Sequence, residues 1–152
     1  MINTQIIKKI QKESLLFNSP LHGLTHWQTV EKYGLYLAKY SKADVNVVSL
    51  FAYFHDCKRE NESHDPKHGY RGAEYAKEIK SLLHISDEQF DSLYKACAGH
   101  TGGINASNNT IATCWDADRL DLGRVGIIPD PDLLFTDEAK RLAETGDVLK
   151  II

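Results

Sequence analysis

The sequence predicts an all-α protein, a compact bundle of about six helices. Apolar residues recur at spacings of three, four and seven along most of the chain. No run shows a convincing alternation of period two, the mark of a half-buried strand. Turn-forming residues punctuate the helical pattern at 18–20, at 101–103, and at Pro129 and Pro131. A length of 152 residues is enough for one buried core and short for two, so we expect a single domain over 1–152.

The first three helices are expected at residues 2–17, 26–40 and 44–57. The first is an amphipathic start that Asn18-Ser19-Pro20 ends, and Asp44 is placed to cap the third through its side chain. In the second and third helices the large apolar residues share one face: Trp27, Val30, Leu37 and Tyr40, then Val47, Val48, Phe51 and Phe54.

Four further helical segments follow a charged loop, and they are expected near 68–83, 86–99, 108–122 and 136–146. The fourth helix opens with His68 on its apolar stripe. The fifth begins with a capping-box pattern, Ser86-x-x-Gln89, and should stop near Gly99. The last is short, with Thr136 as its cap and a glycine at its end.

Composition excludes several classes of protein. A net charge of −3 gives no general basic field for nucleic-acid polymers. No apolar stretch approaches the roughly 20 residues that span a bilayer. The N-terminus also lacks the apolar segment of a signal peptide, so we expect a cytoplasmic protein without a membrane partner. Cys57, Cys97 and Cys114 lack CxxC spacing and are expected to be reduced core thiols.

Several titratable residues fall on the predicted core-facing stripes. His26, His55, His68 and Asp118 share the spacing of the apolar residues, and His100 follows the fifth helix beside glycines. A single histidine on an apolar face is more often a core residue than a ligand. Burial of the whole set is unfavourable unless a cation pairs with it, and imidazoles with carboxylates suit zinc, iron or manganese better than calcium. The set therefore predicts a divalent metal site.

Two choices within this set remain open to the structure. Asp118 keeps the spacing of the buried face and is the better ligand, whereas Asp116 is rotated away and is expected to support the ligands from outside. His22 and His26 have the spacing of a zinc-protease pair, but Gly23 stands where that motif needs Glu. His22 is therefore expected to face either the substrate or solvent.

Four basic residues are candidates for phosphate contacts, although surface charge is the commoner role for any one of them: Lys58, Arg59, Arg71 and Arg124. Lys58 and Arg59 rank highest because they directly follow His55-Asp56. Glu60 and Glu62 are weak candidates for acid or base groups. His64 is a candidate for either the rim of the site or the surface, and His84 is expected at the surface.

Three segments resemble the HD superfamily of metal-dependent phosphohydrolases: His26 with Val30 four positions later, then His55-Asp56, then Ala117-Asp118-Arg119-Leu120. The resemblance covers about residues 22–125. The last segment is similar to the corresponding stretch of (p)ppGpp hydrolases. The segments 68–73 and 100–102 resemble the extra histidine motifs of two-metal members, including diadenosine-tetraphosphate hydrolases of the HD type.

This resemblance implies an HD-domain-like bundle that binds one or two divalent ions, among which Mn, Fe, Zn, Co and Mg are not distinguished. His26, His55, Asp56 and Asp118 would bind the first ion. His68 and His100 would help to bind a second ion, with Asp56 bridging. The chain departs from two subgroups: it has no GYP signature of cyclic-di-GMP hydrolases, and Asp121-Leu122 replaces the His-Asn pair of (p)ppGpp hydrolases.

The resulting expectation is a phosphohydrolase for a small phosphorylated metabolite, with a nucleotide favoured. Asp56 would orient the attacking water, and Lys58 or Arg59 would stabilise developing charge on phosphate. His22, Arg71 and Arg124 would contact substrate. The alternatives are a di-iron oxygenase of the inositol-oxygenase type and a non-catalytic metal- or nucleotide-binding regulatory domain. The sequence leaves a homo-oligomer open.

Overall fold

The computed structural model describes residues 1–151, and within that range the fold is all-α, as predicted. Seven α-helices are present: α1 (Thr4–Glu13), α2 (Leu24–Ser41), α3 (Val45–Phe54), α4 (His68–Glu78), α5 (Asp87–Gly99), α6 (Asn109–Leu120) and α7 (Asp137–Thr145). Short 3-10 turns lie between and after them: η1 (Lys80–Leu82), η2 (Asp121–Val125), η3 (Pro131–Leu133) and η4 (Asp147–Ile151). The sequence predicts about six helices, and each helical segment expected from the sequence overlaps one of these seven.

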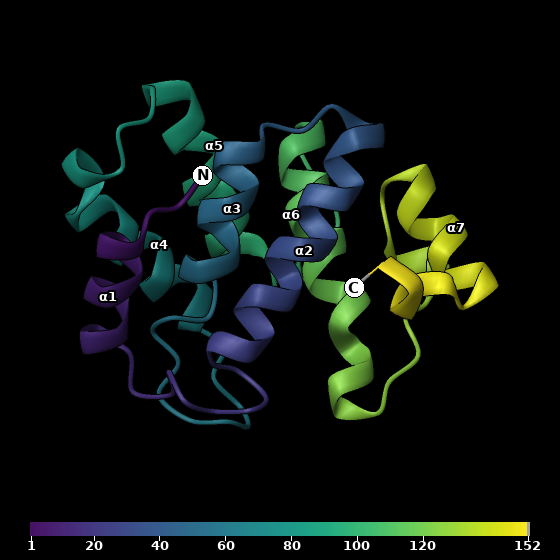
Figure 1. Cartoon of the computed structure of the whole chain (residues 1–152), viewed down its shortest axis with the longest axis horizontal. Helices are drawn as coiled ribbons and strands as arrows, with labels where there is room; N and C mark the ends of the chain where they lie inside the picture. The colour runs from purple at the N-terminus through teal and green to yellow at the C-terminus, as the bar shows by residue number, and fades with distance from the viewer. Residues whose placement is uncertain (152) are drawn as a thin grey trace.

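Helices α2, α3 and α6 form the centre of the bundle (Figure 1). Helix α2 packs along both α3 and α6, and α4 pairs with α5 beside them. Helix α7 and the C-terminal turns lie at the far end from α1 and α4. Every residue of α3 from Val47 to Phe54 is buried, which is typical of a helix enclosed on all sides. The ends of the central helices therefore meet in the interior of the protein.

The predicted caps form as expected. The Asp44 carboxylate accepts hydrogen bonds from the first turn of α3, and Ser86 with Gln89 makes a complete capping box on α5. Thr136 caps α7, which Gly146 ends in the left-handed conformation with φ of 74°. These side chains satisfy backbone groups that the helix itself leaves unpaired.

Three helix ends differ from prediction by three residues or more. Helix α4 ends at Glu78 and not at residue 83, because η1 continues the chain as a tighter turn. Helix α1 ends at Glu13 and not at residue 17, because the chain turns there and Phe17 packs edge-on against Trp27 with ring centroids 5.6 Å apart. Helix α3 ends at Phe54, and tighter turns carry the chain from His55 to Arg59. Tyr40, expected on the buried face of α2, is 59% exposed at the end of that helix.

The three cysteines are free and buried, as predicted, and burial raises the pKa of each thiol. His84 is exposed, also as predicted. Among the described residues, none of the helices has the length and apolar character needed to cross a bilayer.

Candidate metal centre

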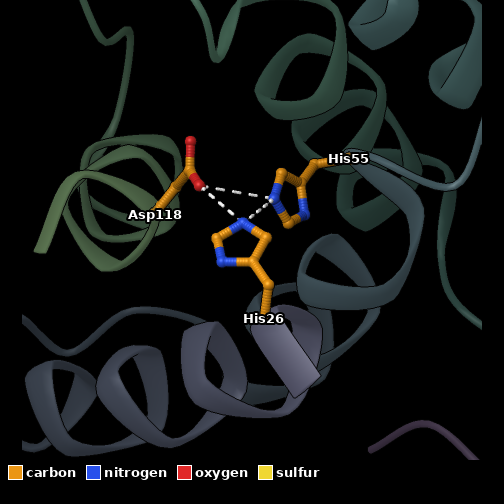
Figure 2. A group of neighbouring side chains, drawn as sticks. All are labelled: His26, His55 and Asp118. Carbon is orange, nitrogen blue, oxygen red and sulfur yellow. Dashed lines mark hydrogen bonds and ion pairs between the residues drawn. The ribbon is translucent and has the colours of Figure 1, made fainter. Parts of the chain in front are cut away.

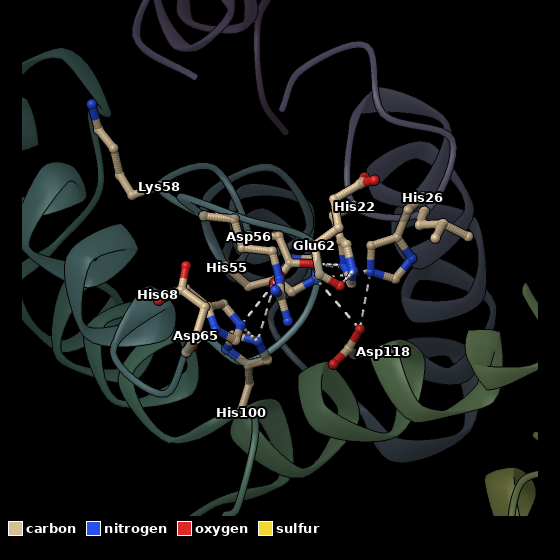
Figure 3. A network of polar contacts seen from close by, with 12 residues as sticks. His22, His26, His55, Asp56, Lys58, Glu62, Asp65, His68, His100 and Asp118 are labelled. Atoms are coloured by element: carbon tan, nitrogen blue, oxygen red, sulfur yellow. Dashed lines mark hydrogen bonds and ion pairs between the residues drawn. The ribbon is translucent and has the colours of Figure 1, made fainter. Parts of the chain in front are cut away.

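Five helices deliver titratable side chains to one buried place at the ends of the central bundle (Figure 3). His26 lies in the first turn of α2, His55 and Asp56 follow α3, and His68 is the first residue of α4. His100 follows α5, and Asp118 lies in the last turn of α6. The core-facing stripes of the sequence thus converge, and the structure brings together every residue that was predicted as a metal ligand.

His26, His55 and Asp118 form the first group of potential ligands (Figure 2). The Nε2 atom of His26 lies 3.1 Å from Nε2 of His55 and 3.1 Å from Oδ1 of Asp118. The Nε2 atom of His55 lies 3.4 Å from the same Asp118 oxygen. One imidazole from each of two helices and one carboxylate from a third therefore face a common point.

Asp56 joins this group to a second one. Its Oδ2 atom lies 3.5 Å from Nε2 of His26 and 3.6 Å from Nε2 of His55. Its Oδ1 atom lies 3.1 Å from Nε2 of His68 and 3.3 Å from Nε2 of His100. Figure 3 shows the Asp56 carboxylate between the two sets of rings. The two oxygens of one carboxylate thus face different histidine pairs.

The other nitrogen of each ring is held by an acceptor. Nδ1 of His55 is 2.9 Å from the carbonyl of Ala52, and Nδ1 of His100 is 2.8 Å from that of Cys97. Since a carbonyl only accepts, each Nδ1 donates, and Nε2 of the neutral ring carries a lone pair. Nδ1 of His68 likewise lies 2.5 Å from the carbonyl of Asp65.

These lone pairs point at one another. Nε2 of His68 and Nε2 of His100 are 3.0 Å apart, a separation at which two lone pairs repel. A cation removes that repulsion, and the carbonyl contacts on the opposite nitrogens are the usual support for metal-binding imidazoles. The donor set of imidazoles and carboxylates fits a divalent transition metal such as zinc, iron or manganese.

The close contacts between histidines and carboxylates also shift the pKa values of His26, Asp118 and Asp56. Burial would lower the pKa of His26, but Asp118 and Asp121 raise it to about 9. Burial would raise the pKa of Asp118, but His55 and His26 hold it well below its usual value. Burial opposes the charge of Asp56 in the same way, and His55 keeps its pKa low. The cluster therefore retains two carboxylate charges in the interior and favours a positive charge beside them.

Two residues that sequence reasoning missed support this cluster. Oδ2 of Asp121 lies 2.7 Å from Nδ1 of His26 and so fixes that ring. Gly69 allows α4 and α5 to approach, because a Cβ there would lie 2.4 Å from the Cys97 carbonyl and 3.0 Å from Nδ1 of His100. A signal for Asp121 existed in its position one turn after Asp118, but nothing in the sequence pointed to the contact of Gly69.

The cluster lies at the floor of a cavity of about 510 Å³. His22, Arg59 and Arg124 line this cavity. Their predicted roles, substrate binding for His22 and Arg124 and catalysis for Arg59, remain predictions. His22 is buried. Its Nδ1 atom lies 3.6 Å from Oδ2 of Asp56 and has no hydrogen-bond partner among residues 1–151. It therefore faces the site and not solvent.

Arg59 carries a second buried polar atom of this kind. Its Nε lies 4.0 Å from Oδ1 of Asp56 and has no hydrogen-bond partner in the described part of the chain. A terminal nitrogen of the same guanidinium donates to the carbonyls of Asn61 and Ser63, which hold the side chain in place. A buried donor without a partner beside a ligand cluster can be satisfied by a bound anion or by water.

Two other basic candidates lie elsewhere. Lys58 points away from the cluster (Figure 3): its ammonium donates to the Glu13 carbonyl at 2.9 Å and lies 4.4 Å from the centre of the Tyr75 ring. Arg71 donates to both Asp65 oxygens, at 2.6 and 2.7 Å, and does not line the cavity. The turn after α3 sends Lys58 towards α1, and Arg71 fixes the loop that precedes α4.

The remaining candidates also have other contacts. Asp116, expected to support the ligands, instead accepts hydrogen bonds from the backbone amides of Phe135 and Thr136, at 2.9 and 2.7 Å. The Glu62 carboxylate binds the Ser19 hydroxyl, while its carbonyl lies 3.3 Å from Nε2 of His22. Glu60 and His64 are exposed. Asp116 is separated from the cluster because side chains two positions apart on a helix point in nearly opposite directions.

Comparisons with known proteins identify the family and agree with the fold. A sequence model of the HD domain matches residues 23–144. The fold is similar to the crystal structure of a predicted HD superfamily hydrolase from an uncultured Thermotogales bacterium. The TM-score is 0.75 at 24% identity, over 96% of this chain and 86% of that one. No curated protein shows significant similarity to the sequence.

Proposed function

The chain belongs to the HD domain family, as its motifs predicted, and on that premise we propose that it is a divalent-metal-dependent phosphohydrolase. Its substrate would be a small phosphorylated metabolite, the class within which the sequence motifs favour a nucleotide. The observation that carries the proposal is the position of Asp56, whose two oxygens face two histidine groups at the floor of a cavity. A buried cluster of this kind is typical of an HD metal site.

His26, His55 and Asp118 would hold one ion, which their close approach supports. His68 and His100 would help to hold a second ion, with Asp56 facing both. Bound divalent ions would supply positive charge for phosphoryl oxygens and would lower the pKa of water. The carbonyl and carboxylate contacts on the Nδ1 atoms keep the rings in the tautomer that leaves Nε2 free for this role.

We propose the following roles for Asp56 and the basic side chains. Asp56 remains charged and would orient the attacking water. Arg59 would donate its Nε, which has no partner among residues 1–151, to a phosphoryl oxygen. Arg124 lines the cavity from η2 and donates to the carbonyls of Leu21 and Asp121, so it would add positive charge beside the same group. Hydrolysis consumes one water: its oxygen bonds to phosphorus, the bond from phosphorus to the leaving oxygen breaks, and that oxygen gains a proton. Lys58 and Arg71 have no part in this scheme because their side chains are committed elsewhere.

The test combines metal content with turnover. Protein purified without chelator or affinity tag would be analysed for metal as wild type, as His55→Ala and as His84→Asn, a matched exposed histidine. We expect near-stoichiometric iron, manganese or zinc in the wild type and the control, and its loss in His55→Ala. Phosphate release from a nucleotide panel with added Mn²⁺ should then disappear in Asp56→Ala. Unchanged turnover in Asp56→Ala would refute the proposal, as would the absence of bound metal in all three proteins.

A second candidate function rests on the same six potential ligands, which also suit a di-iron oxygenase. The discriminating measurement is oxygen consumption by iron-loaded protein, since hydrolysis needs none. A non-catalytic regulatory domain would bind nucleotide tightly and release no product. We rank hydrolysis first because Arg59 adds an unpaired buried donor to the cluster, which suits an anionic phosphoryl group.

A further inference from the structure

The cavity above the candidate metal centre has two chemically different parts. The floor is formed by His22, His68, His100, Asp56 and Asp118, together with Arg59. The rest of the lining includes six apolar residues that we call the apolar wall: Ile104, Leu122, Pro129, Leu133, Leu134 and Phe135. Residues 101–103 and the charged residues Arg119, Arg124, Asp130 and Asp132 lie beside it. A substrate that fills the cavity thus meets charge at one end and hydrocarbon along its length.

The apolar wall is fixed to the helix that carries Asp118. Most of it belongs to residues 127–135, the strap that runs from η2 to α7. Asp116 accepts hydrogen bonds from the end of the strap, and Arg119 donates to the Leu133 carbonyl at 2.9 Å. The Arg119 guanidinium also lies 5.3 Å from the centre of the Phe135 ring. Since Asp116 and Arg119 flank Asp118 on α6, the wall is held at a set position relative to the floor.

The outer part of the cavity offers little to a second phosphate group. Arg119 commits both terminal nitrogens to the carbonyls of Leu133 and Gly103, and Arg124 donates to those of Leu21 and Asp121. Two carboxylates, Asp130 and Asp132, line the same region. They would repel additional negative charge, whereas the unpaired donor of Arg59 lies at the floor.

We propose that the substrate is a phosphomonoester whose organic part is uncharged and largely apolar, and not a nucleoside polyphosphate. This inference rests on the proposed phosphohydrolase function. A single phosphoryl group would occupy the floor, and the organic part would pack along the apolar wall. A cavity of about 510 Å³ is of the size that encloses a small organic ligand.

The test compares alkyl phosphates of one chemical type. Phosphate release from hexyl phosphate and ethyl phosphate would be measured with Mn²⁺-loaded wild-type protein. A fully buried methylene contributes about fourfold, so partial burial of four methylenes should raise kcat/KM by about tenfold or more. Hexyl diphosphate should be the poorer substrate than hexyl phosphate, although its anhydride bond is intrinsically more reactive.

A matched pair of variants locates the preference. Leu133 lines the mouth of the cavity and is 61% exposed, while Leu149 is 78% exposed on η4 and is not among the cavity residues. Leu133→Ser should lower the hexyl-to-ethyl ratio by about threefold or more, and Leu149→Ser should leave the ratio unchanged. The same ratio is expected for binding of hexylphosphonate and ethylphosphonate, which cannot be hydrolysed.

The outcomes separate this inference from the proposed function. Equal kcat/KM for the two esters, or a hexyl preference that Leu133→Ser leaves intact, would overturn the inference while the phosphohydrolase stands. A preference for hexyl diphosphate would also overturn it. If protein with its metal bound releases phosphate neither from these compounds nor from any member of a nucleotide panel, both the proposed function and the inference would be refuted.

Discussion

Replacement of Asp121 by Asn tests how the candidate centre holds its metal. The Asp121 carboxylate lies 2.7 Å from Nδ1 of His26, and the substitution keeps the size of the side chain while removing its charge. Carboxylates that support a metal-binding histidine typically contribute about 10–100-fold to metal affinity. The Asp121 side chain is only 14% exposed, so water screens the contact weakly. We therefore expect affinity to fall by about 30-fold, which corresponds to about 2 kcal/mol.

The assay is a titration with Mn²⁺ against a chelating indicator, which resolves sites of different affinity. Only the site that includes His26 should weaken, because His68 and His100 take their support from backbone carbonyls. Asp91→Asn is the matched control, since Asp91 forms an exposed pair with Lys95 at 2.9 Å and lies on α5. Unchanged affinity in Asp121→Asn would refute the reasoning. An equal loss at both sites would show that Asp121 supports the fold and not one ring.

Three further predictions address the packing and the charges around the centre. Gly69→Ala should destabilise the metal-free protein by about 1–3 kcal/mol in thermal unfolding, since its Cβ meets the backbone of α5; Gly102→Ala, with open space around it, should stay within about 0.5 kcal/mol. Arg59→Ala should lower kcat/KM for phosphate release by about 100-fold or more, whereas Lys58→Ala should change it less than about twofold, and similar losses would contradict the geometry. Burial would raise the pKa of Asp65, but hydrogen bonds from the Glu60 backbone amide and the Arg71 guanidinium lower it. The resulting stability is present above about pH 4 and is lost as pH falls through the lowered pKa, so denaturant unfolding at pH 7 and pH 3 should show a larger loss for the wild type than for Asp65→Asn.

The candidate ligands could be predicted from the sequence because helical spacing reports burial. His26, His55, His68 and Asp118 share the spacing of the apolar residues around them, and helices pack by their apolar faces. Four such stripes, each with a titratable side chain near one end of its helix, converge once the bundle forms. The adjacent position of His55 and Asp56 after the most buried helix then places both groups at the centre.

The basic residues could not be ranked in the same way, because loop geometry decides their direction. Lys58 and Arg59 are neighbours, yet one reaches α1 and the other reaches the cavity. The turn that separates them depends on hydrogen bonds within residues 54–59, which have no periodic signal. Arg71 illustrates a second reason: its pairing with Asp65 is a contact between a loop and a helix, and spacing along one element does not encode it.

Helix α6 shows how one short segment serves two parts of the site. Asp118 points to the histidines, while Asp116 and Arg119 hold the strap that forms the apolar wall. From the sequence, Asp116 and Asp118 are the two candidates for one metal position, and Asp118 is preferred because it shares the spacing of the buried face. That spacing gives the direction of Asp116 and Arg119 but not the segment that they contact. The strap, residues 127–135, has no helical spacing of apolar residues, so the sequence does not predict where it packs. Since one helix holds both the strap and Asp118, we expect a substitution on the cavity side of the strap to alter substrate preference while Asp118 keeps its contact with His26.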